Sequence, residues 1–123
     1  MDERELIYSQ IADNINSFFA DCYVAQKYEP VPESVPCVFI QQISKVRTRQ
    51  YADLANTDRQ WRLTFEVQVF AETLNKAYEI MNFVEEQFTE LAFFEDMCSP
   101  VDNADPKLCR LVARFSAQRG DFI

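Results

Sequence analysis

Residues 60–70 read Gln-Trp-Arg-Leu-Thr-Phe-Glu-Val-Gln-Val-Phe, and this stretch decides the fold class. Apolar and polar side chains alternate strictly along it. The apolar set is Trp61, Leu63, Phe65, Val67 and Val69, and the polar set is Gln60, Arg62, Thr64, Glu66 and Gln68. A side-chain period of two over this length predicts a β-strand with one buried face and one polar face.

A second strand is predicted over residues 108–119, where the same alternation returns. The apolar side carries Cys109, Leu111, Ala113, Phe115 and Ala117, and the polar side carries Arg110, Arg114, Ser116 and Gln118, with Val112 as the exception. The two strands predict a sheet that is buried on one side and wet on the other. A wet sheet face with hydrogen-bonding groups is suited to docking.

Two amphipathic helices are predicted, over residues 3–24 and 72–92. The first has apolar residues at helical spacing, namely Ile7, Ile11, Ile15, Phe18 and Cys22. The second has a wider apolar arc, formed by Leu74, Ala77, Tyr78, Ile80, Met81, Val84, Phe88 and Leu91. Phe83 projects among the charged residues of the opposite arc, either as a scattered exposed aromatic or as a contact with another protein.

The remaining segments complete the predicted order of elements. Pro30, Pro32 and Pro36 define an extended linker, and a strand follows at 37–45. Its first half is apolar on both faces, which is typical of a central strand or of one covered by another subunit. Residues 46–58 are expected to form a long connection. Residues 93–98 are a possible short strand, and a turn is expected from Ser99 to Lys107.

This order predicts an α+β fold in a single domain of residues 1–123, with a mainly antiparallel sheet and two helices packed on one face. The core prediction is specific. Five sheet residues are expected to lie under the helices: Trp61, Phe65, Val67, Leu111 and Phe115. They are expected to face five helix residues: Ile11, Ile15, Met81, Val84 and Phe88.

Composition argues against several classes of function. The 123 residues carry a net charge of −8, which disfavours nucleic-acid binding as the main function. The N-terminus has no pattern of a signal peptide, and no apolar run approaches the roughly 20 residues of a membrane span. A soluble, intracellular protein is therefore expected, with its four scattered cysteines reduced.

The chain also lacks the residues of the commonest active sites. The single glycine excludes a P-loop or a dinucleotide-binding turn, and the absence of histidine removes the usual general base and the usual zinc ligands. Glu85 and Glu86 are interpreted as solvated surface, because neighbours on a helix point in different directions. No metal, cofactor, disulfide or enzymatic activity is expected.

The arginines are the candidates for a binding surface. Arg62, Arg110 and Arg114 are expected on the polar sheet face, with Glu66 nearby if the two strands are neighbours. They would lie either in cross-strand ion pairs or in a subunit interface. Arg47 and Arg49 of the long loop could contact another partner in the same way, although arginines in loops are more often solvated. The candidate interface residues are Arg47, Arg49, Tyr51, Gln60, Arg62, Thr64, Glu66, Gln68, Phe83, Arg110 and Arg114.

The layout of the chain resembles a known family. It has an N-terminal helix, a proline linker into Val35-Pro36-Cys37-Val38-Phe39-Ile40, a long loop, the strand Trp-Arg-Leu-Thr-Phe-Glu-Val-Gln-Val-Phe, a helix and a closing strand around Arg114-Phe115. This layout is similar to the small tail-terminator proteins (tail-completion, or minor capsid, proteins) of long-tailed bacteriophages and prophages.

The resemblance implies a structural protein and not an enzyme. Members of that family form rings, commonly hexamers, that cap the tail tube and join it to the head. The implied partners are other copies of the chain, tail-tube proteins and head-connector proteins. DNA passes through such a ring without specific binding, and no membrane is involved. Assembly would take place in the bacterial cytoplasm, and the mature protein would belong to the virion.

A type III secretion chaperone is the alternative. Those proteins resemble this chain in size, acidity and α+β organisation, and they act as homodimers that hold an extended effector segment. A chaperone usually closes with a helix, whereas this chain is predicted to close with a strand. Solution mass separates the two hypotheses, since a dimer favours the chaperone and a ring favours the terminator.

Overall fold

The computed structural model describes residues 3–26, 35–47, 60–101 and 107–120. Two helices and five strands form in these segments. In chain order they are α1 (Glu3–Phe18), β1 (Tyr23–Ala25), β2 (Cys37–Arg47), β3 (Gln60–Ala71), α2 (Leu74–Glu90), β4 (Phe94–Val101) and β5 (Cys109–Gly120).

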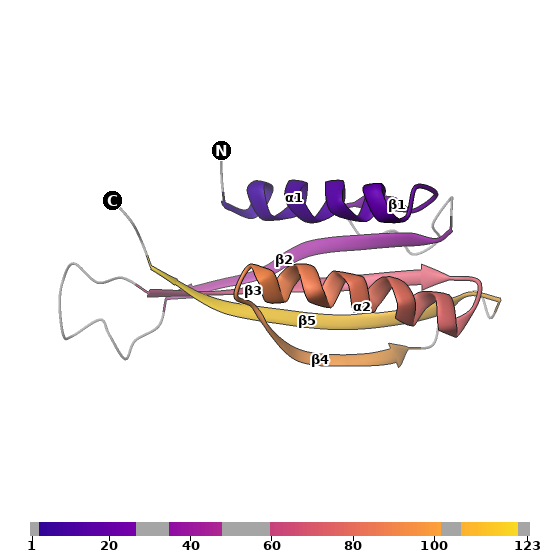
Figure 1. Ribbon diagram of the computed structural model, residues 1–123. Coiled ribbons are helices and arrows are strands. Elements are labelled where there is room, and N and C mark those ends of the chain that lie inside the picture. The colour runs from indigo at the N-terminus through magenta and orange to yellow at the C-terminus, as the bar shows by residue number, and fades with distance from the viewer. Residues whose placement is uncertain (1–2, 27–34, 48–59, 102–106, 121–123) are drawn as a thin grey trace.

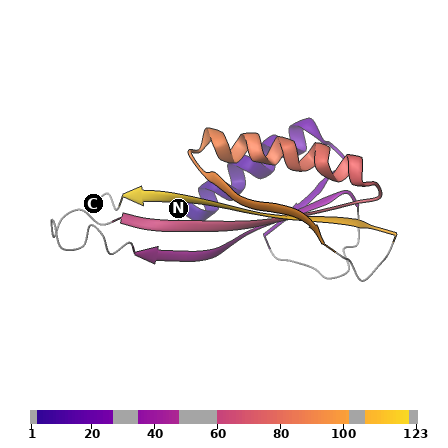
Figure 2. The same cartoon turned by 90° about the horizontal axis from the view of Figure 1, so that it is seen from below.

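The strands form one sheet in the order β1-β2-β3-β5-β4. Neighbouring strands run antiparallel, except that β1 and β2 are parallel. Both helices lie on the same face of the sheet, α1 on the side of β1 and α2 across β3, β5 and β4 (Figures 1 and 2). The expected α+β fold, with two helices on one face of a mainly antiparallel sheet, is confirmed.

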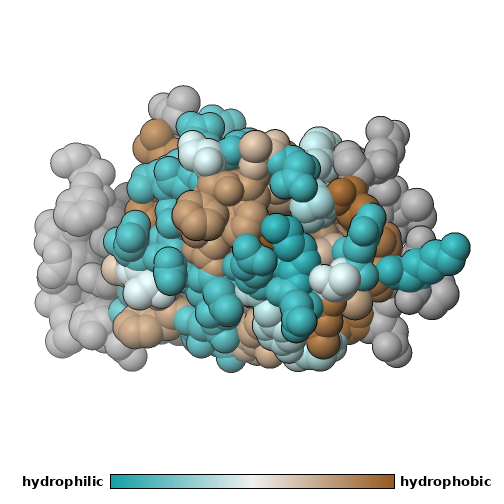
Figure 3. All heavy atoms as spheres, turned by 45° about the vertical axis from the view of Figure 1, so that its right-hand side comes forward, coloured by the Kyte–Doolittle hydropathy of each residue, from teal (hydrophilic) through white to brown (hydrophobic). Residues whose placement is uncertain are grey.

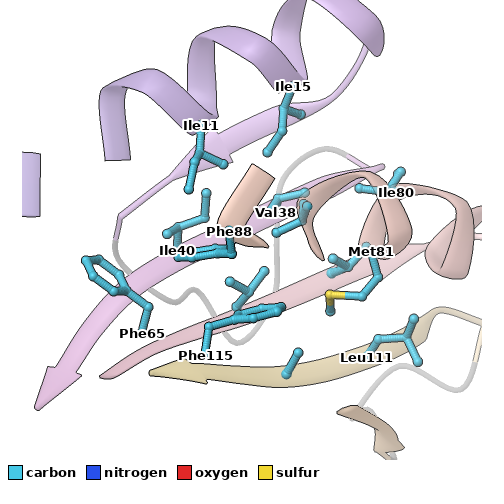
Figure 4. Packing of buried hydrophobic residues seen from close by; sticks show 14 of the residues in the cluster. Ile11, Ile15, Val38, Ile40, Phe65, Ile80, Met81, Phe88, Leu111 and Phe115 are labelled. Atoms are coloured by element: carbon cyan, nitrogen blue, oxygen red, sulfur yellow. The ribbon is translucent and has the colours of Figure 1, made fainter. Parts of the chain in front are cut away.

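The core lies between the helices and the sheet. Ile11 and Ile15 of α1 point towards β2, while Phe88 of α2 lies on Phe115 of β5 (Figure 4). The Phe88 and Phe115 rings are nearly parallel, with their centroids 4.4 Å apart. The expected core residues are buried except for one. Those buried are Ile11, Ile15, Phe65, Val67, Met81, Val84, Phe88, Leu111 and Phe115.

Trp61 is the exception, because it is only half-buried. It lies near the start of β3, opposite Arg47 at the end of β2. The Nζ atom of Lys45 lies 4.9 Å from the centre of the Trp61 ring. Trp61 therefore packs at the margin of the core, where a lysine covers part of its ring.

Strand β2 is buried on both faces at its start, as expected of a central strand. Val38 and Ile40 belong to the main core, while Cys37 and Phe39 form a second small cluster with Phe70 on the opposite face. Since β1 and β3 pair with β2 on its two sides, neighbouring strands account for its central position. The strand extends to Arg47, two residues beyond the prediction, and the remainder of the expected connection, residues 48–58, lies outside the described residues.

Helix α1 ends at Phe18, so the prediction of a helix to residue 24 is wrong. Tyr23 donates its backbone N–H to the carbonyl of Pro36 at 3.0 Å, and residues 23–25 pair with the start of β2. Pairing with a sheet edge satisfies backbone groups that the helix would otherwise have satisfied. Cys22 is buried as expected, but from the turn after the helix.

Strand β4 is longer than the sequence suggested. It spans Phe94–Val101, so the turn expected from Ser99 begins later, and residues 102–106 lie outside the described residues. Pro100, which the sequence pattern assigns to a turn, lies within β4. An edge strand tolerates proline because one of its sides has no ladder to which an N–H must be donated.

Helix α2 begins after Thr73, whose hydroxyl accepts a hydrogen bond from the backbone N–H of Lys76 at 3.2 Å. This N-cap sets the start of the helix two residues after the predicted one. Neither α1 nor α2 combines the length and the apolar content that crossing a membrane requires.

Candidate functional site

The face of the sheet turned away from the helices is called here the outer sheet face. It follows from the alternation in β3: because Leu63, Phe65 and Val67 point to the helices, the residues between them point the other way. The register aligns Glu66 with Arg114 and Thr64 with Ser116 across β3 and β5. Polar residues of two strands therefore meet on this face.

Four of these residues form a continuous chain of hydrogen bonds, called here the polar ladder. Arg114 donates from Nε to Oε2 of Glu66 at 3.1 Å, and its Nη2 lies 3.1 Å from the same oxygen. Gln68 donates from Nε2 to Oε1 of Glu66 at 2.8 Å and accepts at Oε1 from Nε of Arg110 at 3.0 Å. The ladder therefore joins a guanidinium at each end through one carboxylate and one amide.

Arg62 lies beyond the ladder and makes longer contacts. Its Nη2 is 3.5 Å from the hydroxyl oxygen of Ser116 and 3.9 Å from Oδ1 of Asp96. Its side chain remains 57% exposed. An exposed ion pair at this distance contributes little to stability, so Arg62 is available to a partner at small cost.

Strand β4 adds apolar side chains to the outer sheet face. Phe94, Met97 and Val101 are aligned with Ser116, Arg114 and Arg110 of β5, which places them on this face. Phe94 is 78% exposed. A hollow of about 500 Å³ lies beside it, lined by Arg62, Ala92, Phe94, Asp96, Ser116, Ala117 and Gln118. Polar groups beside exposed apolar side chains are typical of protein interfaces.

Exposed apolar side chains also occur on the helices. Leu6 and Phe18 of α1 are 53% and 69% exposed, and Leu74 and Tyr78 of α2 are exposed to a smaller extent. Figure 3 shows apolar side chains at the surface in the middle of one side of the molecule, with polar side chains around them. Exposed apolar area alone therefore does not distinguish the outer sheet face from the helix surfaces. The arginines on the outer sheet face distinguish it.

Most of the candidate interface residues are brought together on this face. Arg47 and Gln60 are terminal residues of β2 and β3, and Arg49 and Tyr51 lie outside the described residues. The candidates that share the outer sheet face are Arg62, Thr64, Glu66, Gln68, Arg110 and Arg114.

Phe83 lies elsewhere, between the two helices. Its ring stacks on Phe18 with centroids 4.9 Å apart and meets the edge of Phe19 at 5.7 Å. The expectation that it projects among charged residues is wrong, because it is half-buried against α1. The positions around α2 alone could not reveal this contact, since the last residue of α1 and the residue after it supply the partner rings.

A cluster of two carboxyl groups and a thiol lies between α2 and β4, and no sequence pattern predicts it. Glu85 of α2 meets Glu95 and Cys98 of β4, with one oxygen or sulfur atom of each residue within 4.8 Å of the others. Glu85 is half-buried, so its interpretation as solvated surface is wrong. Ten residues and a change of element separate Glu85 from Glu95, and no spacing rule connects them.

The cluster changes the titration of its members. Burial raises the pKa of Glu85 to about 7, and a hydrogen bond to Glu95 and the charge of Glu95 add to the effect. The pKa of the Cys98 thiol is also raised, mainly by burial and then by Glu95 and Glu85. A protonated Glu85 can donate a hydrogen bond to Glu95, so a shared proton satisfies the carboxyl pair. Of the described residues, these three are the group that could hold a metal ion.

The raised pKa of the Glu85 carboxyl predicts that the stability of the protein depends on pH. Its pKa is about 7 in the folded protein, against an ordinary value of 4.5. Between these values the folded state binds more protons than the unfolded state, so this group lowers stability as pH rises from 4.5 to about 7. We expect Glu85→Gln to raise the melting temperature above pH 7 and to change it little below pH 4.5. The gain should not exceed about 1 kcal/mol, because solvent screens a half-buried group.

Thermal denaturation, followed by circular dichroism at one pH above 7 and at one pH below 4.5, measures this effect. Glu86→Gln is the matched control, since it removes an exposed neighbouring carboxylate and keeps the Glu85–Glu95 pair. An equal change in melting temperature for Glu85→Gln at both pH values would contradict the assignment.

Comparison with known proteins gives a match in structure only. The sequence matches no protein-family model and no curated protein sequence. A chain of the solved structure "Virion of native gene transfer agent (GTA) particle" has a similar fold, with a TM-score of 0.67. The match covers 97% of this chain and 95% of that chain at 10% sequence identity. At this identity the likeness establishes a shared fold.

Proposed function

We propose that this chain is a structural component of a phage-like virion and not an enzyme. The observation that carries the proposal is the likeness to a gene transfer agent virion chain, which extends over 97% of this chain and 95% of the other. Agreement over nearly the full length of both chains means that the whole arrangement of helices and strands is shared, not one common motif. The missing histidine and the single glycine support a role without catalysis.

Within that class we propose a tail terminator. Copies of the chain form a ring of about six that ends the tail tube and joins it to the head. The support is the resemblance in layout to tail-terminator proteins, together with a sheet face that combines three arginines with exposed apolar side chains. Such a face is suited to contact with a further subunit.

The charge of the chain is compatible with the passage of DNA. A net charge of −8 on each subunit repels the phosphate backbone and disfavours tight binding. DNA would therefore slide through the ring without being held. The partners in this proposal are the tail tube on one ring surface and a head connector on the other.

Light scattering coupled to size-exclusion chromatography tests the proposal. We expect the mass of a ring of about six copies for the wild-type chain, and a shift to monomer for the double variant Arg62→Glu/Arg114→Glu. The two side chains are 57% and 51% exposed. Because Arg114→Glu also removes the partner of Glu66 and places a second carboxylate opposite it, circular dichroism must show that the double variant is folded before its mass is interpreted. Ring-shaped particles in negative-stain electron microscopy would support the same conclusion.

The matched control is Arg4→Glu/Lys45→Glu, which changes the net charge equally away from the outer sheet face. It should keep the wild-type mass. A wild-type dimer would favour the secretion-chaperone hypothesis, and a wild-type monomer would contradict the ring. An unchanged mass of Arg62→Glu/Arg114→Glu would mean that the interface does not lie on the outer sheet face.

A further inference from the structure

Helix α2 carries a strongly acidic solvent-facing surface. The helix contains four glutamates and one lysine. Glu79 lies 4.0 Å from Lys76, whereas Glu86 and Glu90 are exposed and form no ion pair with any of the described residues. Glu86 and Glu90 are one helical turn apart, and like charges at this spacing destabilise a helix. A cation from outside the subunit would relieve their repulsion.

The same surface is hollowed. Asn82, Glu85, Glu86, Thr89 and Glu90 line a shallow depression of about 570 Å³. We call this surface, with its glutamates, the α2 acidic surface. Carboxylates around an open depression are well placed to receive a guanidinium group, which donates hydrogen bonds in a fixed fork.

The outer sheet face has the opposite character. Among the described residues it carries three arginines, Arg62, Arg110 and Arg114, against the two carboxylates of Glu66 and Asp96. Arg114 directs Nε and Nη2 at one oxygen of Glu66 and is still 51% exposed. A guanidinium has five N–H donors, so donors of Arg114 remain for a second acceptor.

These two surfaces lie on opposite sides of the molecule. The helices lie on one face of the sheet, and the outer sheet face is turned away from them (Figure 2). A contact between them therefore joins two different patches and is heterologous. Heterologous contacts propagate from copy to copy and close into a ring when the rotation allows it, unlike the paired contact of a two-fold dimer.

We propose that the outer sheet face of one copy binds the α2 acidic surface of the next copy, with Arg62 and Arg114 facing Glu86 and Glu90. The occupant of the outer sheet face is thus a second copy of this chain, selected by complementary charge. This inference rests on the proposed ring and names the two surfaces that form it.

Charge reversal on each side, followed by mixing, tests the pairing. Glu86→Arg/Glu90→Arg leaves a copy with two basic surfaces, and Arg62→Glu/Arg114→Glu leaves a copy with two acidic surfaces. Each variant alone should associate at least about 100-fold more weakly than wild type, since two close charge pairs are lost and replaced by repulsion. Mixed in equal amounts, the two variants should assemble again, because each supplies the surface that the other needs.

The control variant is Glu5→Arg/Asp13→Arg, which makes the same change in net charge on exposed positions of α1. It should assemble as wild type does and should fail to rescue Arg62→Glu/Arg114→Glu. A second measurement avoids substitutions altogether. Raising the ionic strength from about 0.1 M to about 1 M shortens the Debye length from about 10 Å to about 3 Å and should weaken wild-type assembly.

The outcomes separate this inference from the proposed function. Suppose that the wild-type chain forms a ring. If Glu86→Arg/Glu90→Arg then still assembles, or if the two mixed variants do not associate, the proposed pairing of surfaces is wrong, while the proposed ring is still supported. If the wild-type chain forms no ring, the proposed function fails and the inference fails with it. Restored assembly only in the mixture supports both.

Discussion

Phe65→Ala is expected to lower the free energy of unfolding by about 3–5 kcal/mol. Phe65 is 1% exposed, and the centroid of its ring lies 5.7 Å from that of Phe88 and 5.6 Å from that of Phe93. Truncation removes these aromatic contacts and leaves a cavity between β3 and α2 that close-packed neighbours fill only in part. Urea denaturation, at a protein concentration low enough to keep the chain monomeric, measures the change.

Phe94→Ala is the matched control because it makes the same truncation on a side chain that is 78% exposed. It should change stability by no more than about 0.5 kcal/mol. Similar losses for both variants would mean that the assignment of inward and outward faces on β3 or β4 is wrong. A shift of one residue in register would bring Thr64 inward in place of Phe65.

Gln68→Leu is expected to destabilise the protein by about 1–3 kcal/mol. Gln68 is 7% exposed, and its amide joins Glu66 to Arg110 in the polar ladder. Leucine preserves much of the volume but offers no donor to Glu66 and no acceptor to Arg110. Charged groups that lose a partner in a partly buried site carry the desolvation penalty.

Gln118→Leu is the control, since Gln118 is an exposed glutamine near the end of β5. It should have little effect on the urea midpoint. If Gln68→Leu is as stable as wild type, the ladder contributes nothing through its central amide, and Glu66 and Arg114 form an independent pair. A double-mutant cycle with Glu66→Gln would then show additive effects.

The residues of the outer sheet face could be predicted from the sequence, but the hydrogen bonds between them could not. Alternation alone placed Arg62, Glu66 and Gln68 of β3, and Arg110 and Arg114 of β5, on the polar face of the sheet. Whether those arginines meet the carboxylate depends on how β3 and β5 are aligned, and a strand sequence does not state which residue of another strand lies opposite. The register that aligns Glu66 with Arg114 made the ladder.

The predicted boundaries of helices and strands were wrong where pairing with a distant segment outweighed the local sequence pattern. Helical spacing continued to Cys22, yet residues 23–25 pair with β2, a strand that begins at residue 37. Pro100 signalled a turn, yet an edge position allows it within β4. In both cases the decisive hydrogen bonds join segments whose proximity arises only in the folded sheet.

The sequence by itself determined the α+β class, the inward face of β3 and β5, and nearly all of the core, because side-chain periodicity is a local property of strands and helices. The tertiary structure alone decided the contact of Phe83 with α1 and the meeting of Glu85 with Glu95. Each of those contacts joins elements whose relative position results from packing the whole core. Periodicity identifies the face on which a side chain lies, and only packing decides which side chain it meets there.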